Sequence, residues 1–233
     1  MNRKLGLLII LFLVFVSTCD VIAEIAVGVK KGDWIEYQVT YTGTPAEGHD
    51  VTWAKMEIKD LQGKSVSVEI TARYSNGTTE KITVTLNLET GQLGDDFIIP
   101  ANLNSGDTFF DKNVGNITIS SVEERSYVGA TRTVVNAATS ETTYYWDKAT
   151  GVLVEGISQF SDYTMKTTAD KTNMWQPQIL GLDPTVFYGF LIGVSAVIVI
   201  AIALFIVRRR SFTVGHKAVL QGKNAARQYQ TCI

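Results

Sequence analysis

The stretch YYWDKATGVLVEG, residues 144–156, decides the fold. Residues that favour β-strands precede Asp147 and follow Gly151, and the residue types between them are those that close a hairpin. The Asp147 carboxylate can accept a hydrogen bond from the backbone ahead of it, and Gly151 can adopt a positive φ without steric cost. We therefore interpret the stretch as a turn between two strands and not as a catalytic loop.

The β pattern extends well beyond this turn. Over residues 27–171 apolar residues mostly alternate with polar ones, and Val, Ile, Thr, Tyr and Trp are frequent. In WIEYQVTYT, which begins at Trp34, the alternation places Ile35 and Tyr37 on the face opposite to Trp34 and Glu36. This spacing predicts strands and not helices.

Residues 51–88 predict a three-stranded meander, with turns at DLQGK (60–64) and SNGT (75–78). Asn76-Gly77 is a strong hairpin signal and predicts a two-residue type I′ turn, in which both central residues have positive φ.

Residues 89–110 are rich in Gly, Asn and Asp and predict a long loop or a crossing between sheets. Strand-like runs resume at residue 116 and continue to residue 168. The sequence predicts a mainly β domain of about nine or ten strands, as an antiparallel β-sandwich, a barrel or a curved half-barrel. The pattern does not distinguish among these three arrangements.

Two short segments resemble each other. KKGDWIEY, from Lys30, and NSGDTFF, from Asn104, both place Gly-Asp directly before an aromatic strand. We expect a shared way of turning into a strand, with duplication as the alternative.

The first 23 residues have the layout of a signal peptide. Arg3 and Lys4 precede an apolar run from Leu5 to Val16, and small residues follow as far as Ala23. We expect residues 1–23 to be a signal peptide and residues 24–172 to be an extracytoplasmic domain.

A second apolar run, from Val186 to Val207, has no charged residue. As a helix it would be about 33 Å long, enough to cross a hydrocarbon core of about 30 Å. Asp183 and Pro184 suit the N-cap and first helical position of this predicted transmembrane helix. Three arginines begin the basic segment 208–233, which the positive-inside rule predicts to be cytoplasmic.

The prediction is therefore a single-pass protein of the cell membrane, with its N-terminal domain outside. Residues 173–185 form the predicted juxtamembrane linker, and Trp175 is expected near the lipid surface.

Charge and cysteine content limit the function of the outer domain. From Glu24 to Thr185 there are 13 Lys and Arg against 22 Asp and Glu, a net charge of −9. An acidic domain argues against a nucleic-acid partner. Both cysteines, Cys19 and Cys232, lie outside this segment, so the domain has no disulfide and depends on its hydrophobic core.

The sequence gives little support for catalysis. The outer domain has one histidine, His49, and no cysteine, so a nucleophile with an adjacent base is missing. Glu123 and Glu124 are neighbours on a predicted strand and face opposite sides, while the Asp95-Asp96 pair lacks the spacing of a calcium loop. We predict no catalytic residues, no metal site and no cofactor, with a carboxylate-based hydrolase as the remote alternative.

Two other kinds of site are predicted. Asn76-Gly-Thr and Asn116-Ile-Thr are glycosylation sequons on the predicted outer side. Gly189 and Gly193 are spaced to let a second helix approach.

Aromatic residues are expected to hold the core. We predict that Trp34, Tyr37, Trp53, Tyr145 and Trp146 are partly or wholly buried. Tyr145 and Trp146 are consecutive on a predicted strand, so only one of them can enter a given core. In a half-barrel the other would line a ligand cleft.

The signal, the VKKGDWIEY opening, the YYWDKATG hairpin and the helix ending in RRR resemble uncharacterised archaeal exported single-pass membrane proteins with a β-rich ectodomain. The resemblance spans the chain and brings no functional residues. The chain is also similar to curved-sheet envelope lipoproteins that carry lipids, but its anchor is a helix and it has no good lipidation site.

The predicted function is a membrane-anchored cell-surface binding or structural module of unknown ligand. One alternative is a curved-sheet protein that binds an apolar ligand such as a lipid, and another is an accessory subunit of a membrane complex. The expected partners are the bilayer, through Val186 to Val207, and a protein, glycan or lipid ligand.

Overall fold

The structure is a computed structural model that describes residues 25–45, 48–91 and 96–230. The predicted signal peptide, both cysteines and Asp95 lie outside these residues. The chain divides into two compact units, Met1–Trp175 and Gln176–Ile233.

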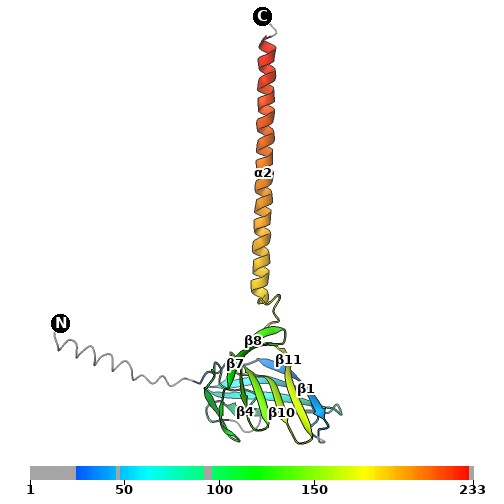
Figure 1. Cartoon of the computed structure of the whole chain (residues 1–233), viewed down its shortest axis with the longest axis vertical. Helices are drawn as coiled ribbons and strands as arrows, with labels where there is room; N and C mark the ends of the chain where they lie inside the picture. The colour runs from blue at the N-terminus through cyan, green and yellow to red at the C-terminus, as the bar shows by residue number, and fades with distance from the viewer. Residues whose placement is uncertain (1–24, 46–47, 92–95, 231–233) are drawn as a thin grey trace, which may run out of the picture. The chain divides into compact units, whose positions relative to one another are not determined.

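The first unit is an antiparallel β domain whose main sheet has nine strands in the described part (Figure 1). Its first meander is β1 (Trp34–Gly43), β2 (Val51–Gln62), β3 (Ser65–Tyr74) and β4 (Thr79–Asn87). Its second meander is β7 (Ser121–Tyr127), β8 (Ala130–Ala138), β9 (Thr142–Asp147), β10 (Leu153–Gln159) and β11 (Tyr163–Thr172). A separate hairpin consists of β5 (Thr108–Asp111) and β6 (Gly115–Thr118).

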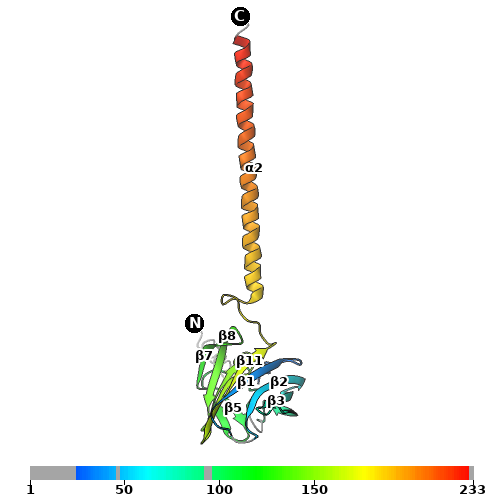
Figure 2. The ribbon, with the colours of Figure 1, turned by 90° about the vertical axis from the view of Figure 1, so that its right-hand side faces the viewer.

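The two meanders join where β1 pairs with β11, which gives the order β4-β3-β2-β1-β11-β10-β9-β8-β7. The edge strands β4 and β7 do not pair with each other, so the sheet curves without closing (Figure 2). Of the three predicted arrangements, the sheet therefore matches the curved half-barrel. The mainly β fold class is confirmed.

The strand count was predicted slightly low. The described residues contain eleven strands, because β5 and β6 have only four residues each and leave little alternation to detect. The three-stranded meander is confirmed by the consecutive pairing of β2, β3 and β4.

The turn that follows β9 is confirmed. Asp147 Oδ1 accepts the Thr150 backbone N–H at 2.9 Å, and Gly151 has φ of 72°. The Asp147 side chain is buried, and its Oδ2 accepts a hydrogen bond from Arg132 Nε at 2.7 Å. Asp147 thus has structural partners and does not face a substrate site.

The predicted type I′ turn at Asn76-Gly77 is wrong. β3 ends at Tyr74 and β4 begins at Thr79, so the loop has four residues, and of the pair only Gly77 has positive φ (85°). Asn76 Oδ1 accepts the Thr78 backbone N–H at 2.8 Å and the Thr78 hydroxyl at 2.7 Å, which stabilises the longer loop.

The two Gly-Asp segments share one turn, as expected. Asp33 N–H donates to Lys30 O at 3.1 Å, and Lys30 N–H donates back to Asp33 Oδ2 at 2.9 Å. The corresponding bonds between Asp107 and Asn104 are 3.0 Å and 2.7 Å.

Trp175 does not lie on an exposed linker, so the expectation of a lipid contact is wrong. Its side chain is buried in the first unit, where the indole N–H donates to Tyr127 O at 3.2 Å. The Arg132 guanidinium lies 4.7 Å from the centre of the indole ring, a favourable cation–π contact.

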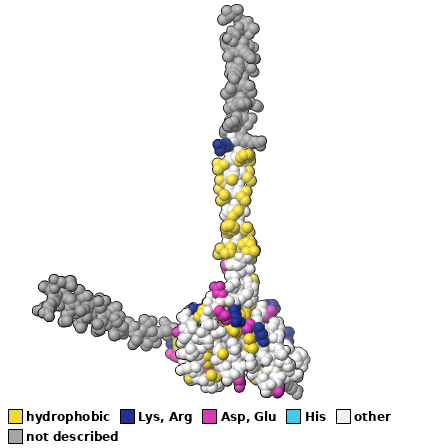
Figure 3. Space-filling view, in the orientation of Figure 1, with side chains coloured by type: hydrophobic (Ala, Val, Ile, Leu, Met, Phe, Trp, Pro, Cys, Tyr) yellow, Lys and Arg dark blue, Asp and Glu magenta, His cyan; other side chains and the backbone are white. Residues whose placement is uncertain are grey.

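The second unit contains α2 (Pro184–Gln230). Asp183 caps this helix as predicted, because its carboxylate accepts the Thr185 N–H at 2.8 Å and its carbonyl accepts the Phe187 N–H at 2.9 Å. Among the described residues, the segment Pro184–Ile206 is long and apolar enough to cross a membrane, with a mean hydropathy of 2.9. Figure 3 shows apolar side chains exposed along much of this segment.

The close contact at Gly151 gives a test of the fold. A Cβ on Gly151 would lie 2.1 Å from Ile99 O, whereas a Cβ on Gly63, which also has positive φ, would have no atom within 4 Å. Gly63→Ala should lower the free energy of unfolding by about 1–2 kcal/mol, because it adds only the strain of a left-handed backbone. Gly151→Ala should lower the free energy of unfolding by about 3 kcal/mol or more, because overpacking adds to that strain. Urea unfolding of both variants measures the difference, and equal costs would contradict the structure.

Candidate functional site

The inner face of the curved sheet is filled at one end. Near the beginning of β1 this face carries side chains that are almost fully buried, namely Ile35, Met56, Ile58, Val66 and Val68. They belong to adjacent strands and meet in one cluster, as the strand registers require. This end of the half-barrel is a solid core.

Residues 96–101, here called the crossing segment, pair with residues 151–153 at the beginning of β10. Ile99 N–H donates to Gly151 O at 2.9 Å, and Leu153 N–H donates to Phe97 O at 2.9 Å. The indole N–H of Trp146 donates to Asp96 O at 2.6 Å. Ile98 packs in the cluster of the solid end, whereas Ile99 packs under the β5–β6 hairpin. The crossing segment therefore joins two hydrophobic clusters.

The other end of the inner face is open and forms an apolar cleft. Its volume is about 190 Å³, and it is lined by Tyr37, Val39, Val51, Ala54, Ile70, Ala72, Phe97, Thr142, Tyr144, Leu153, Gly156, Ser158, Met165 and Thr167. Most of these residues lie in the last part of β1 and β10 and the first part of β2, β9 and β11. The cleft thus lies at the end of the sheet opposite to the end of β11, after which the chain leaves the domain.

Small residues create the space. Ala54, Ala72 and Gly156 face the cleft where larger side chains would fill it. A Cβ built on Gly156 would meet only Leu153 Cδ2, at the ordinary contact distance of 3.7 Å. There is therefore room for a side chain at position 156, and the lack of one leaves a hollow.

Several polar groups of the cleft wall bond to the protein itself. The Thr142 hydroxyl donates to Ser158 Oγ at 3.0 Å, and the Tyr37 hydroxyl donates to Leu153 O at 2.9 Å. Burial raises the pKa of Tyr37 well above its ordinary value. With these groups satisfied, the wall offers a ligand mainly apolar surface.

Aromatic side chains surround the strand ends beyond the cleft. Tyr163 stacks on Phe160 with ring centres 4.5 Å apart, and Tyr41 lies 5.9 Å from Tyr163. The Tyr41 hydroxyl is within hydrogen-bond distance of Val51 O at 2.9 Å. Burial, followed by the charges of Tyr163 and Asp50, raises the pKa of Tyr41 to about 12.

The volume limits what the cleft can hold. Engineered apolar cavities of about 150 Å³ accept benzene, and pockets for drug-sized ligands measure about 300–1,000 Å³. A cleft of about 190 Å³ fits a small apolar group or the end of an alkyl chain, not an entire lipid.

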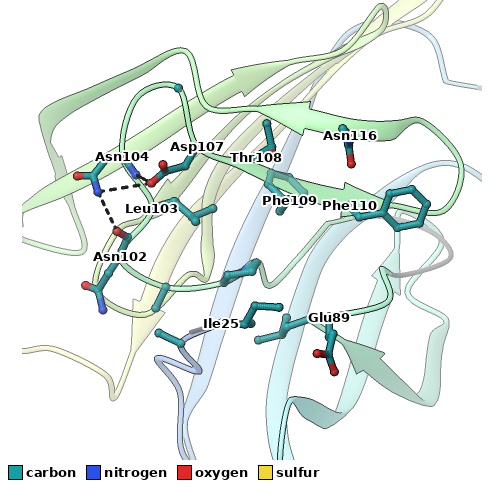
Figure 4. Close-up of a pocket in the computed structure, with 15 residues that line it drawn as sticks. Ile25, Glu89, Asn102, Leu103, Asn104, Asp107, Thr108, Phe109, Phe110 and Asn116 are labelled. Carbon is teal, nitrogen blue, oxygen red and sulfur yellow. Dashed lines mark hydrogen bonds between the residues drawn. The ribbon is translucent and has the colours of Figure 1, made fainter. Parts of the chain in front are cut away.

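A second hollow, of about 660 Å³, lies beside the β5–β6 hairpin (Figure 4). Its wall mixes the apolar Phe109 and Phe110 with polar side chains. Asn104 Nδ2 donates to Asn102 O at 3.4 Å, and Lys148 Nζ donates to Asn104 Oδ1 at 2.6 Å. Part of the polar surface of this hollow therefore already forms hydrogen bonds with other residues of the domain.

Tyr145 and Trp146 lie on opposite faces of the sheet, as predicted, and one of the two was expected to line a ligand cleft. Trp146 is fully buried between Phe109, at 5.5 Å, and Tyr144, at 5.0 Å. Tyr145 lies on the opposite face of the sheet, 3.8 Å beneath the Arg125 guanidinium. Neither residue lines the cleft, which corrects that expectation. Tyr144 lines it instead.

The buried-aromatic prediction is otherwise confirmed: Tyr37 and Trp146 are buried, and Trp34, Trp53 and Tyr145 are partly buried. The alternation that put Trp146 inside also puts Tyr144 on the inner face, so Tyr144 could have been identified from the sequence. Phe97 could not, because it lies in the irregular crossing segment.

The other predicted sites are far apart in the chain. Asn76 and Asn116 are both exposed on hairpins of the first unit. Gly189 and Gly193 are exposed on α2, and a Cβ added at either would meet no described atom within 4 Å beyond the adjacent backbone of the helix itself. Within the described residues, no group of three or more His, Cys, Asp or Glu side chains is placed to hold a metal ion.

No protein-family model matches the chain, and no curated protein matches it. Among solved structures it is similar to the siderocalin Ex-FABP, described as functioning through dual ligand specificities, at 14% identity over 60% of this chain and 70% of that chain. The TM-score is 0.22, which is too low to support an argument. The archaeal family expectation stays a prediction.

The buried hydroxyl of Tyr37 predicts a stability loss at high pH. Because its pKa is raised above the unfolded value of about 10, the native state holds this proton more tightly, and the resulting stability is lost as pH rises above 10. Tyr37→Phe should reduce the stability lost between pH 9 and pH 11, measured by denaturant unfolding. An unchanged loss would show that Tyr37 is not buried as described.

Proposed function

We propose that this protein is a membrane-anchored cell-surface module that takes up an apolar group in the cleft of its half-barrel domain. The observation that carries the proposal is the cleft itself: one end of the inner face is solid, whereas the other end leaves about 190 Å³ of apolar space. Exposed apolar surface of this kind is unfavourable in water unless something covers it.

The composition of the wall supports a chain-like ligand. Val39, Ile70 and Met165 offer aliphatic contacts from three strands, and Met adapts its shape to flexible partners. The cleft has no charged lining residue. The charged or polar end of an amphipathic ligand would therefore stay at the rim, near Tyr41 and Tyr163.

The anchor follows from the apolar segment of α2. Its 23 residues from Pro184 to Ile206 match the thickness of a hydrocarbon core and are not buried against any described residue. An export signal before the domain and arginines after the helix support an orientation with the domain outside. The protein would then present its cleft on the outer side of the membrane.

Filling the cleft should weaken binding without harming the fold. In the unit of residues 25–175, Gly156→Val and Ala72→Leu each place a larger side chain in the space. If they remove contacts with about three methylenes of a fatty acid such as octanoate, the affinity should fall about 50-fold, at about 0.8 kcal/mol per methylene. Isothermal titration calorimetry measures the change.

The matched control for this experiment is Thr168→Val. Thr168 is next to the cleft residue Thr167 on β11, but it points to the other face, where it pairs with Glu155 and Gln38. Its affinity for octanoate should equal that of the parent. Equal affinity in all variants, or no binding by the parent, would contradict the cleft assignment.

Protease accessibility tests the orientation. Protease added to intact cells should digest the domain before residue 184 and leave the tail from Arg208 protected, because the bilayer shields the cytoplasmic side. Antibodies against a tag inserted directly after the predicted signal peptide and against a C-terminal tag follow the two parts. A protected domain with a digested tail would reverse the orientation.

A further inference from the structure

The two sequons differ in what their asparagine side chains do. Asn76 Oδ1 is bonded to both the N–H and the hydroxyl of Thr78, the threonine of its own sequon. These bonds hold the β3–β4 loop in shape. A sugar would attach at Asn76 Nδ2 and leave Oδ1 in place, whereas the Thr78 hydroxyl, which a glycosylating enzyme must reach, is already bonded within the loop.

Asn116 has no such role. It lies on β6, and its exposed side chain makes no hydrogen bond to any residue in the described part of the chain. The threonine of this sequon, Thr118, is exposed as well. The amide and the hydroxyl that a glycosylating enzyme must reach are therefore both accessible.

An exposed aromatic residue lies directly across from Asn116. The hairpin register pairs Asn116 with Phe110, and directly opposed residues of antiparallel strands project from the same face. The Phe110 side chain is 45% exposed, and Val114 at the hairpin tip is 58% exposed. In the folded domain, the exposed apolar surface of Phe110 and Val114 is not covered by any residue in the described part of the chain.

Phe110 and Asn116 also share a wall of the hollow of about 660 Å³. Figure 4 shows both side chains beside this hollow, on the two strands of the hairpin. A saccharide ring has an apolar face of C–H groups, which packs well against an aromatic ring. The hollow has the volume for such a group next to Phe110.

We propose that Asn116 carries an N-linked glycan and that its first sugar packs on Phe110. The inference rests on the export of the domain that the proposed function includes. It assigns the hollow beside the hairpin to a covalently attached saccharide, and it assigns Asn76 a structural role in its loop. The glycan would cover the exposed Phe110 side chain and hinder association through it.

Peptide mass spectrometry decides between the two sequons. Trypsin cleaves after Arg73, Lys81, Lys112 and Arg125, so Asn76 and Asn116 lie on separate peptides, residues 74–81 and 113–125. The full-length protein, made in a host that glycosylates exported proteins, should carry glycan on peptide 113–125 in most molecules and little on peptide 74–81. The reverse distribution would overturn the proposal.

An engineered sequon separates this proposal from the question of export. Asp162→Asn creates Asn-Tyr-Thr in the exposed loop between β10 and β11 with a single substitution. Glycan at position 162 but not at Asn116 would overturn the Asn116 assignment alone. If no position is modified, including 162, the export assignment fails and the proposal fails with it.

The contact with Phe110 has its own test. Phe110→Ala should lower Tm by about 2 °C more in the glycosylated protein than in the unglycosylated Asn116→Gln background. Only in the glycosylated protein does the substitution remove packing between the sugar and the ring. Val114→Ala, at the tip of the same hairpin, is the control and should lower Tm equally in both backgrounds. Equal shifts for Phe110→Ala in both backgrounds would show that the sugar does not pack on its ring.

Discussion

The fold depends on filling the inner face of a sheet that does not close. Because β4 and β7 are not paired with each other, the interior must be covered partly by chain from outside the sheet. Residues 96–101 provide this cover, and their backbone bonds to Gly151 and Leu153 fix them at the beginning of β10. The turn of residues 147–151 is therefore a docking point as well as a connection between β9 and β10, and a side chain at Gly151 would push the crossing segment away.

This constraint also explains why the interior has two unlike ends. The crossing segment and large aliphatic side chains fill one end, while Ala54, Ala72 and Gly156 leave the other open. A core that was selected only for stability would place larger residues at these positions, because an unfilled apolar cavity costs stability. Ion pairs on the outer face of the sheet do not compensate for the stability lost at the open end. Lys59 and Lys81 lie 3.3 Å and 2.9 Å from Glu69, but ion pairs between exposed side chains contribute little to the free energy of unfolding.

Much of this architecture could be predicted from local sequence. Alternation identified the inner face of β1, and the turn chemistry at Asp147 and Gly151 was correct because it depends on adjacent residues. The Asn76-Gly77 turn was assigned wrongly because a side-chain bond to Thr78 outweighs the usual preference. Trp175 was misplaced because its partners, Tyr127 and Arg132, are more than 40 residues away in the chain. The cleft could not be located, because it depends on which strands are neighbours and on the course of residues 96–101.

In the proposed function, the open end of the half-barrel accommodates an alkyl group. The most direct measurement uses a fatty acid with a photoreactive group near the end of its alkyl chain, incubated with the full-length protein in native membranes and then irradiated. Peptide mass spectrometry should find crosslinks on cleft residues such as Val39, Ala72 and Met165, in addition to those expected along the membrane helix. Crosslinks confined to Pro184–Ile206, with none in the β domain, would contradict the claim.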